Sequence, residues 1–114
     1  MSIRATTRDL GRVVVVDISG RITLGEGSST LRNLLRDLLS QGHKKIVLNL
    51  ADVDYIDSAG IGELVSGFSS VTKNGGELKL LHLTRRVHDL LQITKLFTVF
   101  EVHSDEAAAL RSFA

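Results

Sequence analysis

Residues 46–65 read IVLNLADVDYIDSAGIGELV, and the spacing of the hydrophobic residues changes within this stretch. Residues 44–50 form a nearly continuous apolar run, which is typical of a strand buried on both faces of a parallel sheet. Further on, Ile61, Leu64 and Phe68 recur at the spacing of one helix face. A buried strand followed by an amphipathic helix indicates an α/β fold.

The segments upstream extend this pattern. Residues 3–7 and 12–19 are β-rich and are joined by a short polar link, which favours an antiparallel hairpin. A helix follows, with a leucine stripe at i, i+3, i+4, i+7 and i+8 formed by Leu31, Leu34, Leu35, Leu38 and Leu39. Ser28 or Ser29 is the expected cap of this helix, and Gly42 is expected to end it.

Downstream, residues 74–76 end the central helix and residues 77–83 form the next strand. Thr84 caps another helix, residues 97–102 form a short last strand, and a final helix runs over residues 104–113, opened by a serine. The predicted order is ββαβαβαβα. It gives a mixed, mostly parallel sheet of about five strands with an initial antiparallel hairpin and about four helices, so residues 1–114 are expected to form a single domain.

Composition excludes several classes of protein. The chain has 114 residues with 14 Lys+Arg and 13 Asp+Glu, a formal net charge of +1, which lacks the basic excess of nucleic-acid binding proteins. It contains no cysteine, so disulfides and thiolate chemistry are excluded. The apolar runs are too short to cross a bilayer and no targeting segment is recognisable. We therefore expect a cytoplasmic protein that contacts neither membrane nor nucleic acid.

Ser58 stands where the strand and its loop give way to the helix, and three roles are open to it. A serine at this place is typical of a helix N-cap. It could also be a catalytic nucleophile, or a hydroxyl presented for phosphorylation near the positive end of a helix.

The catalytic role lacks partners. A nucleophile elbow needs G-x-S-x-G, but Ile56 stands where the first glycine should be, and no histidine and acid pair is recognisable as base and orienting group. The histidines show no i, i+4 metal spacing; they are His43, His82, His88 and His103. Asp52 and Asp54 are explained as turn-forming residues, with metal binding as the less favoured alternative. We expect no enzyme activity, no metal and no cofactor.

Small residues follow Ser58, namely Ala59, Gly60 and Gly62. Glycine early in a helix costs roughly 0.5–1 kcal/mol relative to alanine, which suggests a compensating reason. The favoured reason is an open surface on which another protein lies close to the backbone.

The ordered set of these features resembles the bacterial anti-sigma factor antagonists, the stand-alone STAS domains. The similarity runs the length of the chain and rests on Gly20, IVLNL at 46–50, Asp57-Ser58-x-Gly60, Gly75-Gly76, Thr84-x-x-Val87, Leu90-Leu91 and Thr94-x-Leu96.

The resemblance implies that Ser58 is phosphorylated by an anti-sigma factor that is itself a serine kinase, and that a PP2C-type phosphatase reverses the modification. It further implies that the unmodified protein binds the anti-sigma factor and frees the sigma factor, whereas the phosphorylated form cannot bind. The partner-binding residues that it implies are Thr23, Asp57, Ser58, Ala59, Gly60, Ile61 and Gly62.

Three positions depart from the pattern of the family, and one of them is Lys95, which stands where a glycine is frequent after the third helix. Thr23 stands where many members have aspartate, and Ala59 stands where a serine or threonine is common. The departures at Thr23 and Ala59 keep an alternative function open: a STAS scaffold or ligand-binding module that does not switch, within a signalling or lipid-transport assembly. In that case Ser58 would serve as a helix cap.

Overall fold

The computed structural model describes residues 3–113. Along the chain the elements are β1 Ile3–Asp9, β2 Val14–Ile22, α1 Glu26–Ser40, β3 Lys45–Ile56, α2 Ser58–Lys73, β4 Glu77–Leu81, α3 Arg85–Ile93, β5 Val102–His103 and α4 Glu106–Arg111. The predicted order of strands and helices is confirmed.

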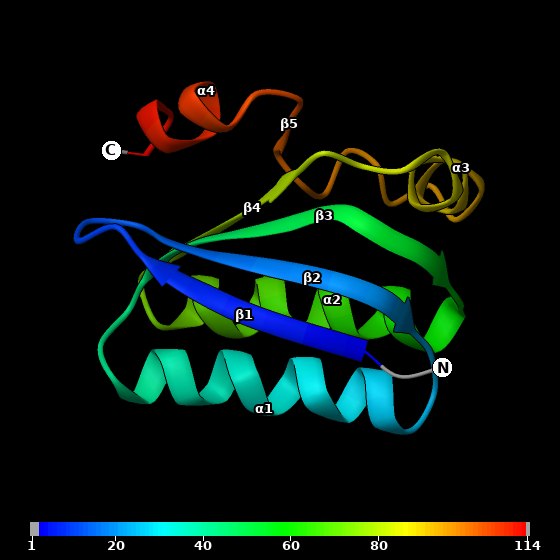
Figure 1. Ribbon diagram of the computed structural model, residues 1–114, viewed down its shortest axis with the longest axis horizontal. Coiled ribbons are helices and arrows are strands. Elements are labelled where there is room, and N and C mark those ends of the chain that lie inside the picture. Colours follow the sequence, from blue (N-terminus) through cyan, green and yellow to red (C-terminus); the bar gives the residue numbers. More distant parts are fainter. Residues whose placement is uncertain (1–2, 114) are drawn as a thin grey trace.

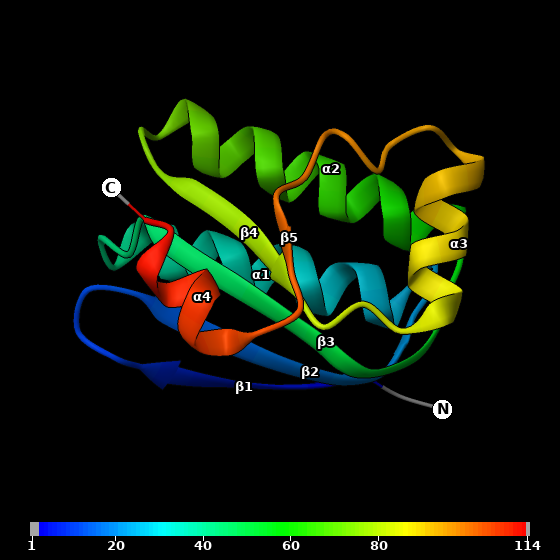
Figure 2. The ribbon, with the colours of Figure 1, turned by 90° about the horizontal axis from the view of Figure 1, so that it is seen from above.

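Within the described residues the strands form one five-stranded sheet in the order β1-β2-β3-β4-β5. β1 is antiparallel to β2, and each later neighbouring pair is parallel. Figure 1 shows α1 and α2 on one face of this sheet, with α3 and α4 on the other. The view onto that second face in Figure 2 shows α3 and α4 at opposite ends of it.

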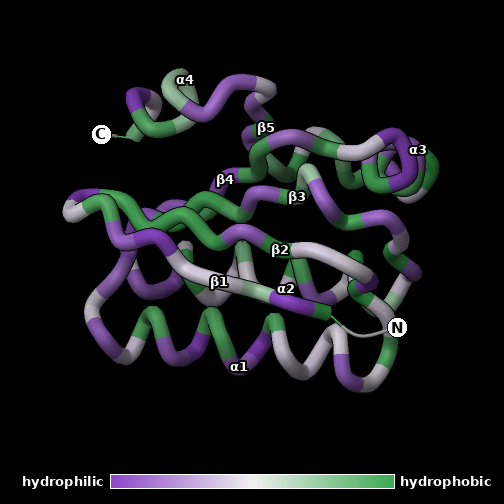
Figure 3. The backbone as a smooth tube through the Cα atoms, in the orientation of Figure 1, coloured by the Kyte–Doolittle hydropathy of each residue, from purple (hydrophilic) through white to green (hydrophobic). Residues whose placement is uncertain are grey.

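The main hydrophobic core lies largely between the sheet and the two long helices, and it also includes Val87 and Leu91 of α3. Long apolar runs in β2 and β3 cross the middle of the molecule (Figure 3), and alternate residues of these strands face α1 and α2. Leu31 and Leu35 of the predicted stripe are at most 3% exposed, and each such burial contributes roughly 1.5–3 kcal/mol before entropy is subtracted. A second cluster under α4 contains Val15, Val47 and Phe113.

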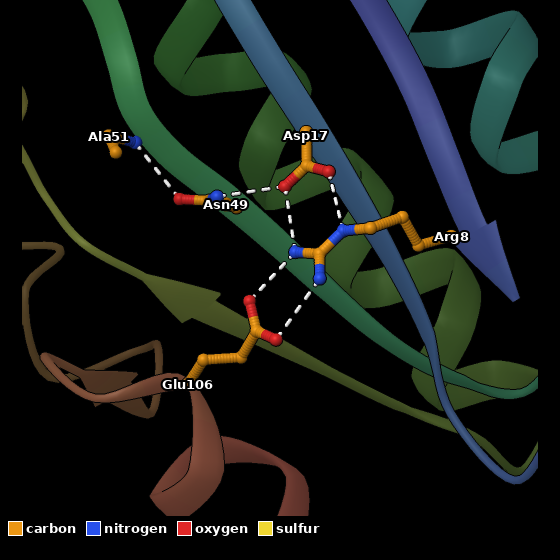
Figure 4. Close-up of polar contacts among 5 residues, drawn as sticks. All are labelled: Arg8, Asp17, Asn49, Ala51 and Glu106. Atoms are coloured by element: carbon orange, nitrogen blue, oxygen red, sulfur yellow. Dashed lines mark hydrogen bonds and ion pairs between the residues drawn. The ribbon is translucent and has the colours of Figure 1, made fainter. Parts of the chain in front are cut away.

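A polar network joins α4 to the initial hairpin (Figure 4). The Arg8 guanidinium donates to both carboxylate oxygens of Asp17 at 2.7 and 3.0 Å and to both of Glu106 at 3.1 and 2.7 Å. Asn49 donates to Asp17 at 2.8 Å and accepts from the Ala51 N–H at 3.1 Å. These bonds raise the pKa of Arg8 and lower the pKa of Asp17 and of Glu106, so all three groups stay charged at neutral pH.

Several predicted boundaries were wrong. The central strand does not end at residue 50 but continues to Ile56, because its last residues pair with the end of β2. The fourth strand ends at Leu81, and the next residue, His82, has a φ of 57°. The last strand is Val102–His103 rather than 97–102, since Phe100 turns inward and packs edge-on against Phe68.

Two helix caps also differ from the prediction. Gly25 occupies the N-cap of α1 without a side-chain hydrogen bond, so Ser28 and Ser29 lie inside the helix. Asp105 caps α4 in place of the neighbouring serine, because its carboxylate accepts from the Ala108 N–H at 2.9 Å. Thr84 caps α3 as predicted.

Candidate functional site

The start of α2 is held by Asp57, which is the N-cap residue. One carboxylate oxygen accepts a hydrogen bond from the Gly60 N–H at 2.8 Å, and the other accepts from the Leu24 N–H at 3.1 Å. The prediction that Ser58 caps this helix was therefore wrong by one residue. Asp57 is favoured because its two oxygens satisfy the helix and the β2–α1 loop at once.

The charge of Asp57 is fixed by these donors. Partial burial alone would raise its pKa, but the N–H groups of Gly60, Leu24 and Ala59 together hold the pKa of this carboxyl below its ordinary value. A negative charge next to Ser58 is thus a permanent feature of the site at neutral pH.

Ser58 is the first residue of α2 and its side chain is exposed. Its hydroxyl makes no hydrogen bond to any residue of the range 3–113, because Asp57 already performs the capping. An exposed hydroxyl without a structural task can be modified without breaking an internal contact.

Gly60 is needed for packing inside the molecule. It is buried, and a Cβ at this position would overlap the carbonyl oxygen of Ile22 and the side chain of Ile56. The expectation that Gly60 leaves an open surface for a partner was wrong, since the start of α2 lies directly on the end of β2. Gly62 differs, because it is exposed and a Cβ there would meet no atom within 4 Å.

The other residues expected to bind a partner differ in how far they are exposed to solvent. Ile61 is 2% exposed and its side chain belongs to the main core, so it faces away from solvent. Ala59 and Thr23 are half-buried. Reasoning from the sequence missed Leu24, which is 79% exposed and is tied to Asp57 through its N–H. The sequence feature that could have identified Leu24 as exposed is that it is an isolated apolar residue directly before a glycine in a loop.

We call the surface formed by Thr23, Leu24, Ser58 and Gly62 the Ser58 surface. It lies where β2 and β3 end and where α1 and α2 begin, on one end of the molecule (Figure 1). Among its members, Leu24 provides the large apolar group and Ser58 the free hydroxyl.

Two arginines flank the same end of the sheet. The guanidinium of Arg21 lies 4.7 Å from the centre of the Tyr55 ring, and that of Arg86 lies 4.3 Å from it. These cation–π contacts join the ends of β2 and β3 to the start of α3. The Thr84 hydroxyl strengthens the connection by donating to the Val53 carbonyl at 3.0 Å.

Within residues 3–113, no three His, Asp or Glu side chains gather in a way that could hold a metal ion. His103 lies 2.6 Å from Glu101, and His88 lies 3.4 Å from Asp89. Neither pair includes Ser58. The helices of the described range are also too short or too polar to cross a membrane.

Comparisons with known proteins give the family. The model of the STAS domain matches residues 4–109. The anti-sigma-B factor antagonist of Bacillus subtilis is 34% identical over 102 residues, covering 90% of this chain and 92% of that protein. An anti-sigma factor antagonist from Mycobacterium paratuberculosis has a similar structure, with a TM-score of 0.86, 20% identity and coverage of 98% of this chain and 94% of that one.

The Bacillus cell fate determinant SpoIIAA in its phosphorylated form also shares the fold. The TM-score is 0.73 at 19% identity, and the match covers 95% of this chain and 98% of that one. The family model spans nearly the whole chain, and the Bacillus subtilis relative matches over a similar length. The chain therefore belongs to the STAS domain family.

Proposed function

We propose that this protein is an anti-sigma factor antagonist that is switched by phosphorylation of Ser58. In its unmodified form it binds an anti-sigma factor that is a serine kinase, and the sigma factor is released. The observation that carries the proposal is the exposed Ser58 hydroxyl, which is free of internal hydrogen bonds to the described residues beside a capping Asp57. The name of the Bacillus subtilis relative, an anti-sigma-B factor antagonist, supports the class of partner.

The Ser58 surface suits reversible binding. Leu24 offers an apolar contact, and the absence of a side chain at Gly62 lets a partner approach the helix backbone. The Asp57 carboxylate keeps the β2–α1 loop against α2, so both halves of the surface are held in one arrangement before binding. Such preorganisation lowers the entropic cost of association.

A phosphate on Ser58 would have little effect on the fold. It carries about −1.5 to −2 charges and gains only about 0.3–1 kcal/mol from the start of a helix at an exposed site. Repulsion from the Asp57 carboxylate, at an assumed separation of ~6 Å and an effective dielectric of 20–80, costs about 0.7–3 kcal/mol per pair of unit charges. Because Asp57 already occupies the Gly60 N–H, that donor is not available to the phosphate.

The effect on binding would be larger. In an interface the dianion would have to lose its water without gaining a cationic partner, which costs several kcal/mol. That cost corresponds to a loss of ~10³ or more in affinity. Phosphorylation thus abolishes docking while the fold persists, and a PP2C-type phosphatase restores the binding form. The proposed place of action is the cytoplasm.

The test combines the protein with its kinase-type anti-sigma factor and ATP. Mass spectrometry of peptides should find a phosphate on Ser58, and none in Ser58→Ala. The kinase should bind the unmodified protein and release the modified one. Phosphate on another residue would contradict the proposal, and equal binding before and after modification would favour a STAS scaffold that does not switch.

A further inference from the structure

A hollow lies between α1 and α2 on the face of these helices that is turned away from the sheet. Its volume is about 500 Å³, and the residues that line it are Arg32, Leu35, Arg36, Leu39, Ser40, Glu63, Ser66, Gly67, Ser70 and Asn74. Figure 2 shows the two helices side by side beneath the sheet. The proposed phosphorylation site at Ser58 is not among the lining residues.

Small residues on α2 create this space. Ser66, Gly67 and Ser70 face α1 where longer side chains would fill the gap between the helices. A Cβ at Gly67 would lie 2.5 Å from a methyl group of Leu35, so the helices approach each other closely at this point and form the floor of the hollow. Leu35 and Leu39 make that floor apolar.

The walls carry an unbalanced positive charge. Glu63 is 9% exposed and is bound by Arg32 through two contacts of 2.9 and 3.4 Å. This pairing raises the pKa of Arg32, and the two charges cancel. Arg36 lines the same hollow and is exposed, but it has no hydrogen bond or ion pair with the residues of the described range. One guanidinium is therefore free to bind an anion.

Neutral polar side chains from both helices also line the hollow. Ser40 and Asn74 are engaged in local bonds, to the Asp37 and Ser70 carbonyls respectively. Within the described range, the hydroxyls of Ser66 and Ser70 have no such bond, so they can donate to oxygen atoms of a ligand. A free guanidinium, two hydroxyls and an apolar floor together match a phosphate group attached to an apolar body.

We propose that the hollow between α1 and α2 binds a small organic phosphate monoester. Arg36 pairs with the phosphate, Ser66 and Ser70 donate hydrogen bonds to it, and the apolar part of the ligand rests on Leu35 and Leu39. The volume of about 500 Å³ is in the usual range for small-molecule sites. This site is independent of phosphorylation at Ser58.

The test is a titration of the full chain with phenyl phosphate, followed by amide shifts in ¹⁵N NMR spectra. We expect saturable shifts at residues 66–70 and at Arg36, with a Kd in roughly the millimolar range, as is usual for a ligand of this size. Inorganic phosphate and phenol, tested separately, should each bind more weakly. Equal affinity for inorganic phosphate would overturn the role of the apolar floor.

Variants identify the residues responsible. Arg36→Gln should weaken binding by about tenfold, because a charge-assisted pair is lost. Arg85→Gln is the matched control, since the Arg85 side chain is 92% exposed and does not line the hollow, and it should bind as the parent does. Ser70→Leu should fill the space and abolish binding. Unchanged affinity in Arg36→Gln, or shifts that map outside the two helices, would overturn the proposal.

Discussion

Replacing Gly60 by alanine tests how the start of α2 is docked. Gly60 is buried in the first turn of the helix, and a Cβ there would overlap the carbonyl oxygen of Ile22 and approach a side-chain carbon of Ile56 to 2.7 Å. The nearest obstacle is a backbone atom of a central strand, which cannot move aside as a flexible side chain can. The helix must therefore shift, and the hydrogen bond from the Gly60 N–H to Asp57 must lengthen.

The expected change in the free energy of unfolding of Gly60→Ala is the balance of two opposing effects. Alanine favours a helix over glycine by about 0.5–1 kcal/mol. Forcing an additional carbon into a packed interior costs typically 1–3 kcal/mol, and occasionally more. For Gly60→Ala we expect a net loss of about 1–2 kcal/mol in the free energy of unfolding. Gly62→Ala is the matched control, because no atom lies within 4 Å of its Cβ position, and it should gain about 0.5–1 kcal/mol.

Urea unfolding followed by circular dichroism at 222 nm measures both variants against the parent. The two substitutions are the same chemical change in adjacent turns of one helix, so their difference isolates the contact with β2. We expect a separation of roughly 1.5–3 kcal/mol between the variants. A Gly60→Ala protein as stable as Gly62→Ala would refute the reasoning that the helix start rests on the Ile22 carbonyl.

Further predictions concern charge and capping, and all are measured by urea unfolding. Asp57→Ala should lower the free energy of unfolding by about 1–2 kcal/mol, because the helix cap is lost. Ser58→Ala should change the free energy of unfolding by less than about 0.5 kcal/mol. Equal losses in the two variants would contradict the assignment of Asp57 as the cap. The pKa values of Asp17 and Glu106 are lowered in the folded protein from ordinary values of 3.8 and 4.5, so the stability they contribute is complete above those values and is lost as the pH falls through the lower folded values. Arg8→Met should lower stability at pH 7 by about 1 kcal/mol and flatten this acid dependence, and an unchanged pH profile would contradict the role of the network.

Local sequence patterns were sufficient for the order of elements. The leucine stripe of α1 repeats at helical spacing, and the apolar run of β3 is continuous. Each pattern extends over several residues, so one residue that departs from it does not change the predicted element. The cap of α2 was harder to predict because two residues that can each cap a helix are adjacent in the sequence. Ser58 follows Asp57, and Asp57 is favoured because its two oxygens accept from the Gly60 N–H and also from the distant Leu24 N–H. A contact across 33 residues leaves no local trace.

Parts of the site depended on packing that the sequence did not reveal. Gly60 and Gly62 look alike in the sequence, yet one lies against a strand and the other faces solvent. The exposure of Leu24 follows from the loop conformation after β2, and the hollow beside Gly67 from how closely two helices approach. The pattern identified Ser58 correctly as a residue at the start of α2, but the surface around it required the tertiary structure.

The most direct measurement compares the affinity of the anti-sigma factor for the unmodified protein and for the protein phosphorylated on Ser58, with urea unfolding of both forms in parallel. We predict a loss of ~10³ or more in affinity. The free energy of unfolding should fall by no more than the repulsion from the Asp57 carboxylate, about 0.7–3 kcal/mol per pair of unit charges, since the phosphate breaks no internal contact. Equal affinities, or a loss of binding that accompanies unfolding of the modified protein, would contradict a switch that acts at the surface.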